Sequence, residues 1–284
     1  MSKIRVLIVD DSVVIRRILS DELSKDPMIE IAGKAATGKI ALSMIEQVKP
    51  DILTMDIEMP EMDGLTAVSE IRKTNKVLPI IMFSTLSQRA ARETLEALSR
   101  GANDYVTKPA NVGSAALAME RVRDELLPKI KSLCSHLSKS SQLASAPVPK
   151  LVKSPVTAPV QSMPPSRIDV LAIGISTGGP NALGDFLPSI PKDFPVPIVI
   201  VQHMPPVFTR CLAERLSTKC QIPVEEGVAG AVLRPGKIWI APGDYHMVVE
   251  KNGPSVELAM NQDAQENSCR PAVDVLFRSV TQVY

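Results

Sequence analysis

Aromatic residues make up only 3% of this 284-residue chain, too few to supply a base-stacking surface for nucleic acid. The four cysteines form no CxxC pair, which argues against a zinc knuckle or a disulfide framework. No hydrophobic run approaches the ~18–20 residues that cross a bilayer, and a net charge of +1 gives no strong attraction to nucleic acid or membranes. The opening MSKIRVLIVDDS reaches two aspartates too early for a signal peptide. A soluble, cytoplasmic protein is therefore expected.

The length and composition suit two folded domains, since hydrophobic residues make up 45% and charged residues 22% of the chain. Residues 126–166 contain lysines but no aspartate or glutamate, and prolines are concentrated between Pro147 and Pro165. Such a stretch is typical of a semi-extended linker. We therefore expect a first domain at 1–125, a basic, Pro-rich linker at 126–166 and a second domain at 167–284.

Strand patterns alternate with helix patterns in both expected domains. In the first domain the expected strands are 4–9, 29–35, 52–55, 79–83 and 104–106, and the expected helices are 13–23, 38–48, 64–72, 90–98 and 115–127. In the second domain the expected strands are 170–175, 197–201, 237–240 and 247–250, and the expected helices are 180–187, 207–217 and 272–280. This alternation predicts two α/β domains, each with a parallel sheet covered on both faces.

Polar side chains stand where the strands of the first domain end. They are Asp10 and Asp11 after the first strand, Asp56 after the third, Ser84 after the fourth and Lys108 after the fifth. Because the carboxyl ends of parallel strands meet at one edge, these groups should converge there. Three close carboxylates favour Mg²⁺, and a facing lysine and hydroxyl suit a phosphoryl group. The alternative is that each aspartate only caps a helix or solvates a loop.

The second domain begins with a strand followed by GISTGGP, a tight strand-to-helix turn that presents Ser176. The string also resembles a dinucleotide-binding loop, but no acid lies at the end of the next strand, where a ribose partner belongs. That strand instead ends at His203, on the same sheet edge as Ser176, where a general base could take the hydroxyl proton. His246 is an alternative base or a substrate-contact residue.

The strings VLIVDDS, LTMDIEMPEMDG, IIMFS and GANDYVTKP resemble a response-regulator receiver domain over residues 1–125. The resemblance implies a flavodoxin-like fold in which Asp56 accepts phosphate from a histidine kinase and Asp10, Asp11 and Asp56 hold Mg²⁺. It further implies that Lys108 contacts the phosphoryl group and that Ser84 and Tyr105 are switch residues. For Tyr105, simple core packing is the alternative.

The strings AIGISTGGP, VQHMP, IWIAPGDYHM and CRPAVDVLF resemble the catalytic domain of the chemotaxis protein-glutamate methylesterases. The resemblance implies a doubly wound, Rossmann-like hydrolase domain that demethylates, and also deamidates, methyl-accepting chemotaxis receptors. Ser176 and His203 match the family's nucleophile and base, and Thr177 helps to position the oxyanion. The resemblance also implies that the unphosphorylated receiver domain covers the hydrolase face of the second domain.

The family's third triad member lies in a GMGxDG loop, which this chain lacks, so we expect the catalytic domain to be incomplete at its C-terminus. Asp244, Asp263 and Asp274 are poor substitutes for that acid. The first alternative function is therefore a catalytically impaired phosphorelay or receptor-docking protein. The second is a DNA-binding regulator, which the absence of a helix-turn-helix pattern or basic recognition helix after residue 166 disfavours. Neither nucleic acid nor membrane insertion is expected.

Overall fold

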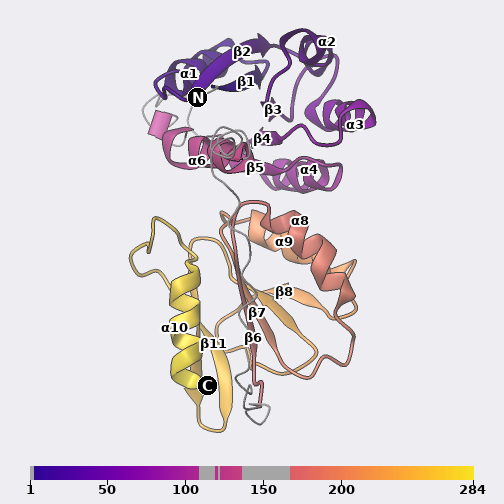
Figure 1. Cartoon of the computed structure of the whole chain (residues 1–284). Coiled ribbons are helices and arrows are strands. Elements are labelled where there is room, and N and C mark those ends of the chain that lie inside the picture. Colours follow the sequence, from indigo (N-terminus) through magenta and orange to yellow (C-terminus); the bar gives the residue numbers. More distant parts are fainter. Residues whose placement is uncertain (1–2, 109–118, 121, 136–166) are drawn as a thin grey trace, which may run out of the picture.

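The computed structural model describes residues 3–108, 119–120, 122–135 and 167–284. They form two α/β domains, drawn one above the other in Figure 1. Among the described residues, no helix combines the length and the apolar character needed to span a membrane. Most of the expected linker, residues 136–166, and residues 115–118 and 121 of the expected helix 115–127 lie outside the described residues.

The first domain is a five-stranded parallel sheet with the order β2-β1-β3-β4-β5, the flavodoxin-like order that the sequence predicts. Its strands are β1 (Ile4–Val9), β2 (Ile29–Ala35), β3 (Ile52–Asp56), β4 (Ile80–Ser84) and β5 (Asp104–Thr107). Its helices are α1 (Val13–Leu23), α2 (Gly38–Val48), α3 (Gly64–Thr74) and α4 (Gln88–Ser99). Each helix begins after a residue whose side-chain oxygen accepts a hydrogen bond from a first-turn N–H; these caps are Ser12, Thr37, Asp63 and Ser87.

A further helical segment follows β5 and packs on the first domain. It consists of a π-helix, η1 (Val122–Leu126), and α6 (Leu127–Leu133). Leu126, Ile130 and Cys134 are buried against the same face of the sheet as α1. Residues 126–135, expected in the linker, are therefore helical and packed; their spacing of four places the three buried side chains on one helix face.

The second domain contains a four-stranded parallel sheet with the order β6-β7-β9-β8. Its strands are β6 (Leu171–Ile175), β7 (Ile198–Gln202), β8 (Val224–Glu226) and β9 (Ile238–Ile240), followed by an antiparallel hairpin of β10 (His246–Asn252) and β11 (Ser255–Asn261). Its helices are α8 (Gly179–Phe186), the 3₁₀ turn η2 (Leu187–Ser189), α9 (Phe208–Ser217) and α10 (Val273–Val283). The sequence analysis missed β8 and β11.

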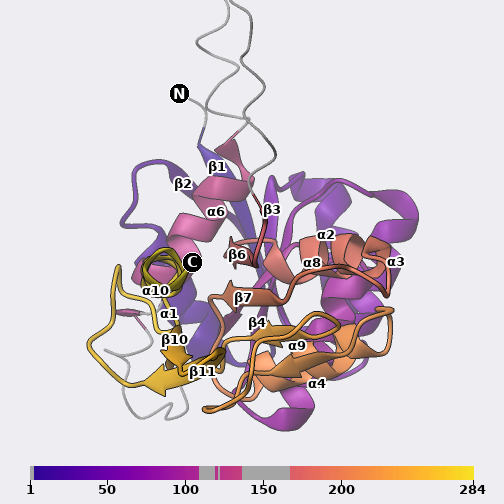
Figure 2. The same ribbon diagram turned by 90° about the horizontal axis from the view of Figure 1, so that it is seen from below.

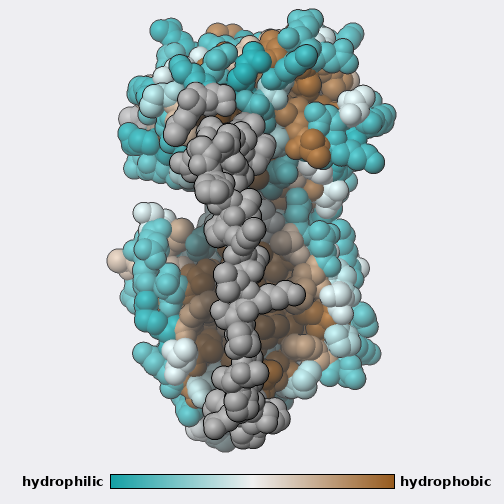
Figure 3. All heavy atoms as spheres, viewed as in Figure 1, coloured by the Kyte–Doolittle hydropathy of each residue, from teal (hydrophilic) through white to brown (hydrophobic). Residues whose placement is uncertain are grey.

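Alternation along β7 explains how this sheet is covered on both faces. Ile198 and Ile200 point to the side of α8 and α9, whereas Val199 and Val201 pack with α10 and the β10–β11 hairpin. Figure 2 shows β6 beside β7, with α10 and the hairpin on the side away from α8. β6 is an edge strand of this sheet and is only partly buried. Figure 3, which has the same view as Figure 1, shows hydrophobic residues gathered in the second domain around this edge.

The two domains contact each other through α4 and β5 of the first and α8 and α9 of the second. The ring of Tyr105 in β5 stacks on Phe208 at the start of α9, with centroids 4.8 Å apart and planes 5° apart. Asn181 in α8 donates to the Ala102 carbonyl at 2.9 Å. An arginine on α9, Arg215, hydrogen-bonds Glu96 at 3.0 Å. One continuous apolar cluster thus runs through both domains.

Candidate functional site

The carboxyl edge of the first sheet carries the predicted acidic pocket. In this pocket Asp10 and Asp56 are buried and Asp11 is exposed. One carboxylate oxygen from each of the three lies within 4.8 Å of the others. The Lys108 ammonium lies 2.8 Å from Asp10 Oδ2 and 2.7 Å from Asp56 Oδ2. The backbone N–H of Ile57 donates to Asp56 Oδ1 at 2.7 Å. The structure therefore brings the predicted carboxylates and lysine together in one pocket.

Burial dominates the electrostatics of this pocket. Desolvation, with the neighbouring charge of Asp10, raises the pKa of Asp56 to about 6, although Lys108 acts in the opposite direction. Burial also raises the pKa of Asp10. Burial alone would lower the pKa of Lys108, but Asp56 and Asp10 together raise it. The three carboxylates are hard oxygen donors of the kind that Mg²⁺ prefers, and they fit a divalent cation that would offset their mutual repulsion.

Ser84 lies in the same pocket, at the end of β4. Its side chain is buried, and its hydroxyl is 2.8 Å from the hydroxyl of Thr94 on α4. The predicted switch aromatic, Tyr105, is buried in the contact with Phe208, and burial raises its pKa well above 10. This position is compatible with both interpretations of Tyr105, as a switch residue and as core packing, because the ring is buried and also connects the two domains.

The nucleophile and base candidates of the second domain lie side by side. Ser176 Oγ is 3.3 Å from Nδ1 of His203, because β6 and β7 pair directly and end at the same edge. Gly178 precedes α8 with a positive φ of 74°, a conformation that glycine adopts without strain. Ser176 and Thr177 are both exposed at this turn.

His203 has the properties of a neutral base. Burial lowers its pKa below 6.5, an effect that the charge of Asp274 opposes and that of Lys129 reinforces. A thiol that the sequence analysis did not single out, Cys269, lies 3.6 Å from the same Nδ1 atom. The other ring nitrogen, Nε2, is buried and has no hydrogen-bond partner among the described residues.

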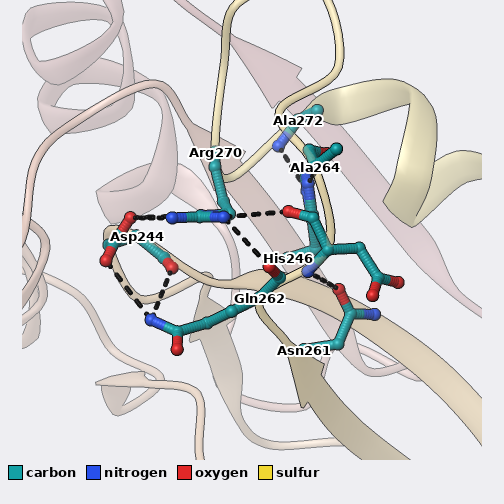
Figure 4. A network of polar contacts seen from close by, with 8 residues as sticks. Asp244, His246, Asn261, Gln262, Ala264, Arg270 and Ala272 are labelled. Atoms are coloured by element: carbon teal, nitrogen blue, oxygen red, sulfur yellow. Dashed lines mark hydrogen bonds and ion pairs between the residues drawn. The ribbon is translucent and has the colours of Figure 1, made fainter.

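Two of the three acids considered as substitutes for a triad carboxylate have other partners. Asp244 is bound by Arg270, with Nη2 at 2.6 Å from Oδ1, and Asp274 accepts from Asn267 at 3.1 Å. For the third acid, Asp263, the contact with Arg270 is made by the backbone carbonyl, at 2.9 Å, and not by the carboxylate. Figure 4 shows the network around Arg270. No hydrogen bond joins these acids to His203 in the described part of the chain.

His246, the alternative base, is buried and uses both ring nitrogens. Nδ1 accepts from the N–H of Ala272 at 3.2 Å, so Nε2 carries the proton and donates to the Ala264 carbonyl at 3.1 Å (Figure 4). Neither nitrogen remains to accept a hydroxyl proton or to contact substrate. The geometry therefore corrects this alternative: His246 connects the start of β10 to two loop segments, which sequence spacing alone could not reveal.

A phosphoacceptor-type pocket joined to a domain with a serine–histidine pair defines a response regulator with a hydrolase output domain. Comparison with known families agrees: residues 6–119 match the response regulator receiver domain, and residues 171–284 match the CheB methylesterase. The chain belongs to the CheB methylesterase family, whose curated members are named protein-glutamate methylesterase/protein-glutamine glutaminase.

The similarity to individual members extends over the whole chain. The protein from Trichodesmium erythraeum is 50% identical over all of this chain and 80% of its own length. The protein from Nocardioides sp. is 50% identical over 98% of this chain and 76% of its own length. The crystal structure of the Thermotoga maritima CheB methylesterase catalytic domain aligns with 42% of this chain and 63% of its own, at 39% identity and a TM-score of 0.41.

Proposed function

We propose that this protein is a phosphorylation-activated hydrolase that works in the cytoplasm. It demethylates γ-glutamyl methyl esters of methyl-accepting chemotaxis receptors and deamidates receptor glutamines. The names of its relatives support both reactions. The observation that carries the proposal is that the receiver domain contacts α8 and α9, the two helices that follow Ser176 and His203.

In the proposed reaction, Ser176 Oγ attacks the ester carbonyl while His203 Nδ1 takes the hydroxyl proton. The C–O bond to the methoxy group then breaks, and His203 returns the proton to it, which releases methanol and leaves an acyl-serine. Water attacks the acyl-serine with His203 again as base, giving glutamate and free Ser176. Thr177 and the amides at the start of α8 stabilise the oxyanion. With a glutamine side chain, ammonia leaves in place of methanol.

Asp56 is the proposed phosphoacceptor, and a histidine kinase is the donor. Its carboxylate attacks the phosphoryl group, and the kinase histidine leaves. Asp10, Asp11 and Asp56 would hold Mg²⁺, which when bound neutralises charge on the transferred group. The Lys108 ammonium, 2.7 Å from Asp56 Oδ2, would contact the phosphoryl oxygens. These groups would together neutralise the charge of the transferred phosphoryl group.

The test compares hydrolysis of methylated receptor with and without a small phosphodonor and Mg²⁺. We expect methanol release that increases with phosphodonor, that disappears in Ser176→Ala and that loses its phosphodonor dependence in Asp56→Asn. The same Asp56→Asn variant should incorporate no phosphate. Undiminished hydrolysis by Ser176→Ala would refute the nucleophile, and undiminished phosphate in Asp56→Asn would refute the acceptor.

A second candidate is a phosphorelay or receptor-docking protein without effective turnover. The observation that favours it is the His203 Nε2 atom, which lacks a carboxylate partner among the described residues. Without such an acid, the histidine loses a group that orients it and stabilises its cationic form. Normal phosphorylation at Asp56 and receptor binding, with no methanol release above that of Ser176→Ala, would select this candidate.

A further inference from the structure

Gln202, the last residue of β7, is a buried amide at the end of an otherwise apolar strand. It is 2% exposed and directly precedes His203. Its Nε2 donates to the Ser176 carbonyl at 3.0 Å and to the His203 carbonyl at 3.4 Å. The orientation of the amide follows from its chemistry, because an oxygen in that place would face two acceptors.

This one side chain connects the backbone of the nucleophile to the backbone of the base. The Ser176 carbonyl also accepts from the Gly179 N–H at 2.9 Å, and the His203 N–H donates to Ile175 at 3.2 Å. These bonds define the two turns, and the amide ties one to the other. The Ser176 Oγ to His203 Nδ1 distance of 3.3 Å is already at the long end for a hydrogen bond, so a small relative shift would break it.

The start of α8 fits closely around the amide. A Cβ atom on Gly179 would lie 1.8 Å from Gln202 Oε1, so only glycine fits there without displacing the side chain. Oε1 itself is buried and has no partner in the described residues. An unpaired buried oxygen costs stability, and its removal offsets the loss of the two Nε2 hydrogen bonds, of which one is long at 3.4 Å and the other goes to a carbonyl that keeps the Gly179 N–H as donor. An apolar side chain of similar length should therefore be tolerated in the fold.

We propose that Gln202 is a positioning residue that keeps Ser176 and His203 in register for proton transfer, at a cost to the stability of the domain. The proposal rests on the proposed function, in which these two residues are nucleophile and base. It predicts opposite effects of one substitution: Gln202→Met retains the volume and removes the unpaired oxygen, but it releases the two carbonyls from each other. A residue with only a structural role would lose stability and activity together.

The experiment measures the rate at which a fluorophosphonate probe labels the full chain, together with the melting temperature. The probe reports the reactivity of Ser176 without any receptor. We expect Gln202→Met to label at least tenfold more slowly than wild type, with an unchanged or higher melting temperature. In wild type, a neutral His203 should give a labelling rate that reaches a plateau as the pH rises. In Gln202→Met we expect no plateau, and the rate should instead rise steadily with the hydroxide concentration. The control is Ser279→Ala, which removes a buried hydroxyl that bonds Val249 and Leu276 far from the pair.

Each outcome decides a separate question. Wild-type labelling by Gln202→Met, or a loss of rate only in proportion to a lowered melting temperature as in Ser279→Ala, would overturn the positioning role. Equal labelling of wild type and Ser176→Ala would overturn the proposed nucleophile instead. If Gln202→Met does not fold, Gln202→Leu takes its place. Failure of both to fold would also overturn the proposal, because the amide would then be a requirement of the fold.

Discussion

Arg215→Ala should raise the hydrolase activity of the unphosphorylated protein by about fivefold. Arg215 lies on α9 of the catalytic domain, and its guanidinium bonds two residues on α4 of the receiver, Glu96 at 3.0 Å and Ser99. The Arg215 and Glu96 side chains are 25% and 41% exposed, so solvent screens their attraction. The substitution removes both contacts and leaves the apolar part of the interface in place.

The magnitude follows from these two contacts. A partly exposed ion pair contributes about 0.5 kcal/mol, and the additional hydrogen bond to Ser99 contributes about 0.5 kcal/mol net. We call the arrangement with α4 on α9 closed and the arrangement without this contact open. Together the two bonds favour the closed arrangement by about 1 kcal/mol, which corresponds to about a fivefold change in the closed-to-open ratio. If basal activity reflects the open fraction, it rises by the same factor.

The assay is methanol release from methylated receptor, first without and then with saturating phosphodonor. Basal activity should rise in Arg215→Ala, whereas fully phosphorylated activity should match wild type, because that state no longer depends on the contact. Arg210→Ala is the matched control: it lies on the same helix, but its ion pair, to Glu226 at 3.4 Å, is within the catalytic domain. Glu96→Gln should reduce the effect of Arg215→Ala when the two are combined. Equal basal activity in the Arg215 and Arg210 variants would refute the reasoning.

Three further predictions concern protons and stability. Because burial lowers the pKa of His203, the acid limb of kcat/KM should have its midpoint below pH 6.5, and a midpoint above that value would contradict a neutral buried base. The pKa of Asp56 is about 6, so at lower pH a Mg²⁺ ion must displace a proton from this carboxylate in order to bind. The affinity for Mg²⁺, measured by calorimetry, should therefore fall at least ~10-fold from pH 7 to pH 5. The fall should be less steep in Asp56→Asn. His246→Leu should lower the free energy of unfolding of the second domain by about 2–4 kcal/mol, because the amide of Ala272 and the carbonyl of Ala264 both lose their hydrogen-bond partner. An unchanged midpoint of urea unfolding would disprove this structural role.

The fold and the two sites could be predicted to different depths. The receiver fold was predictable because most of its strands are short apolar runs and each of the first four is followed by a capped amphipathic helix. The convergence of Asp10, Asp56 and Lys108 followed from strand ends in a parallel sheet, and so did the pairing of Ser176 with His203. All these inferences use only position along a strand, which the sequence displays directly.

What could not be predicted depends on contacts between distant segments. β8 has three residues, too few for a periodic pattern, and it is recognised only by its pairing with β9. The linker prediction for residues 126–166 depends on their lysines, their lack of acids and the prolines from Pro147 to Pro165, whereas residues 127–133 form α6, in which Pro128 is acceptable in the first helical turn. The Tyr105–Phe208 stack joins residues about a hundred positions apart, and no local signal marks such a partner.

The proposed regulation depends on one helix that serves both sites. On α4, Thr94 bonds the hydroxyl of Ser84 in the phosphoacceptor pocket at 2.8 Å, while Glu96, only two residues later, bonds Arg215 of the catalytic domain at 3.0 Å. The Ser84 hydroxyl donates instead to the carbonyls of Thr85 and Ala90, at 3.3 and 3.5 Å, and Ala90 lies on α4. In the proposed phosphorylated state, the phosphoryl oxygens on Asp56 are stronger acceptors that compete for this proton. Since Ala90 and Glu96 lie on the same continuous helix, we expect a shift at Ala90 to be carried to Glu96. Packed interfaces change between discrete arrangements rather than deforming gradually, so we expect a displacement of α4 to break the Arg215 contacts together with the apolar contacts of the interface, and in this way to release the helices that follow Ser176 and His203.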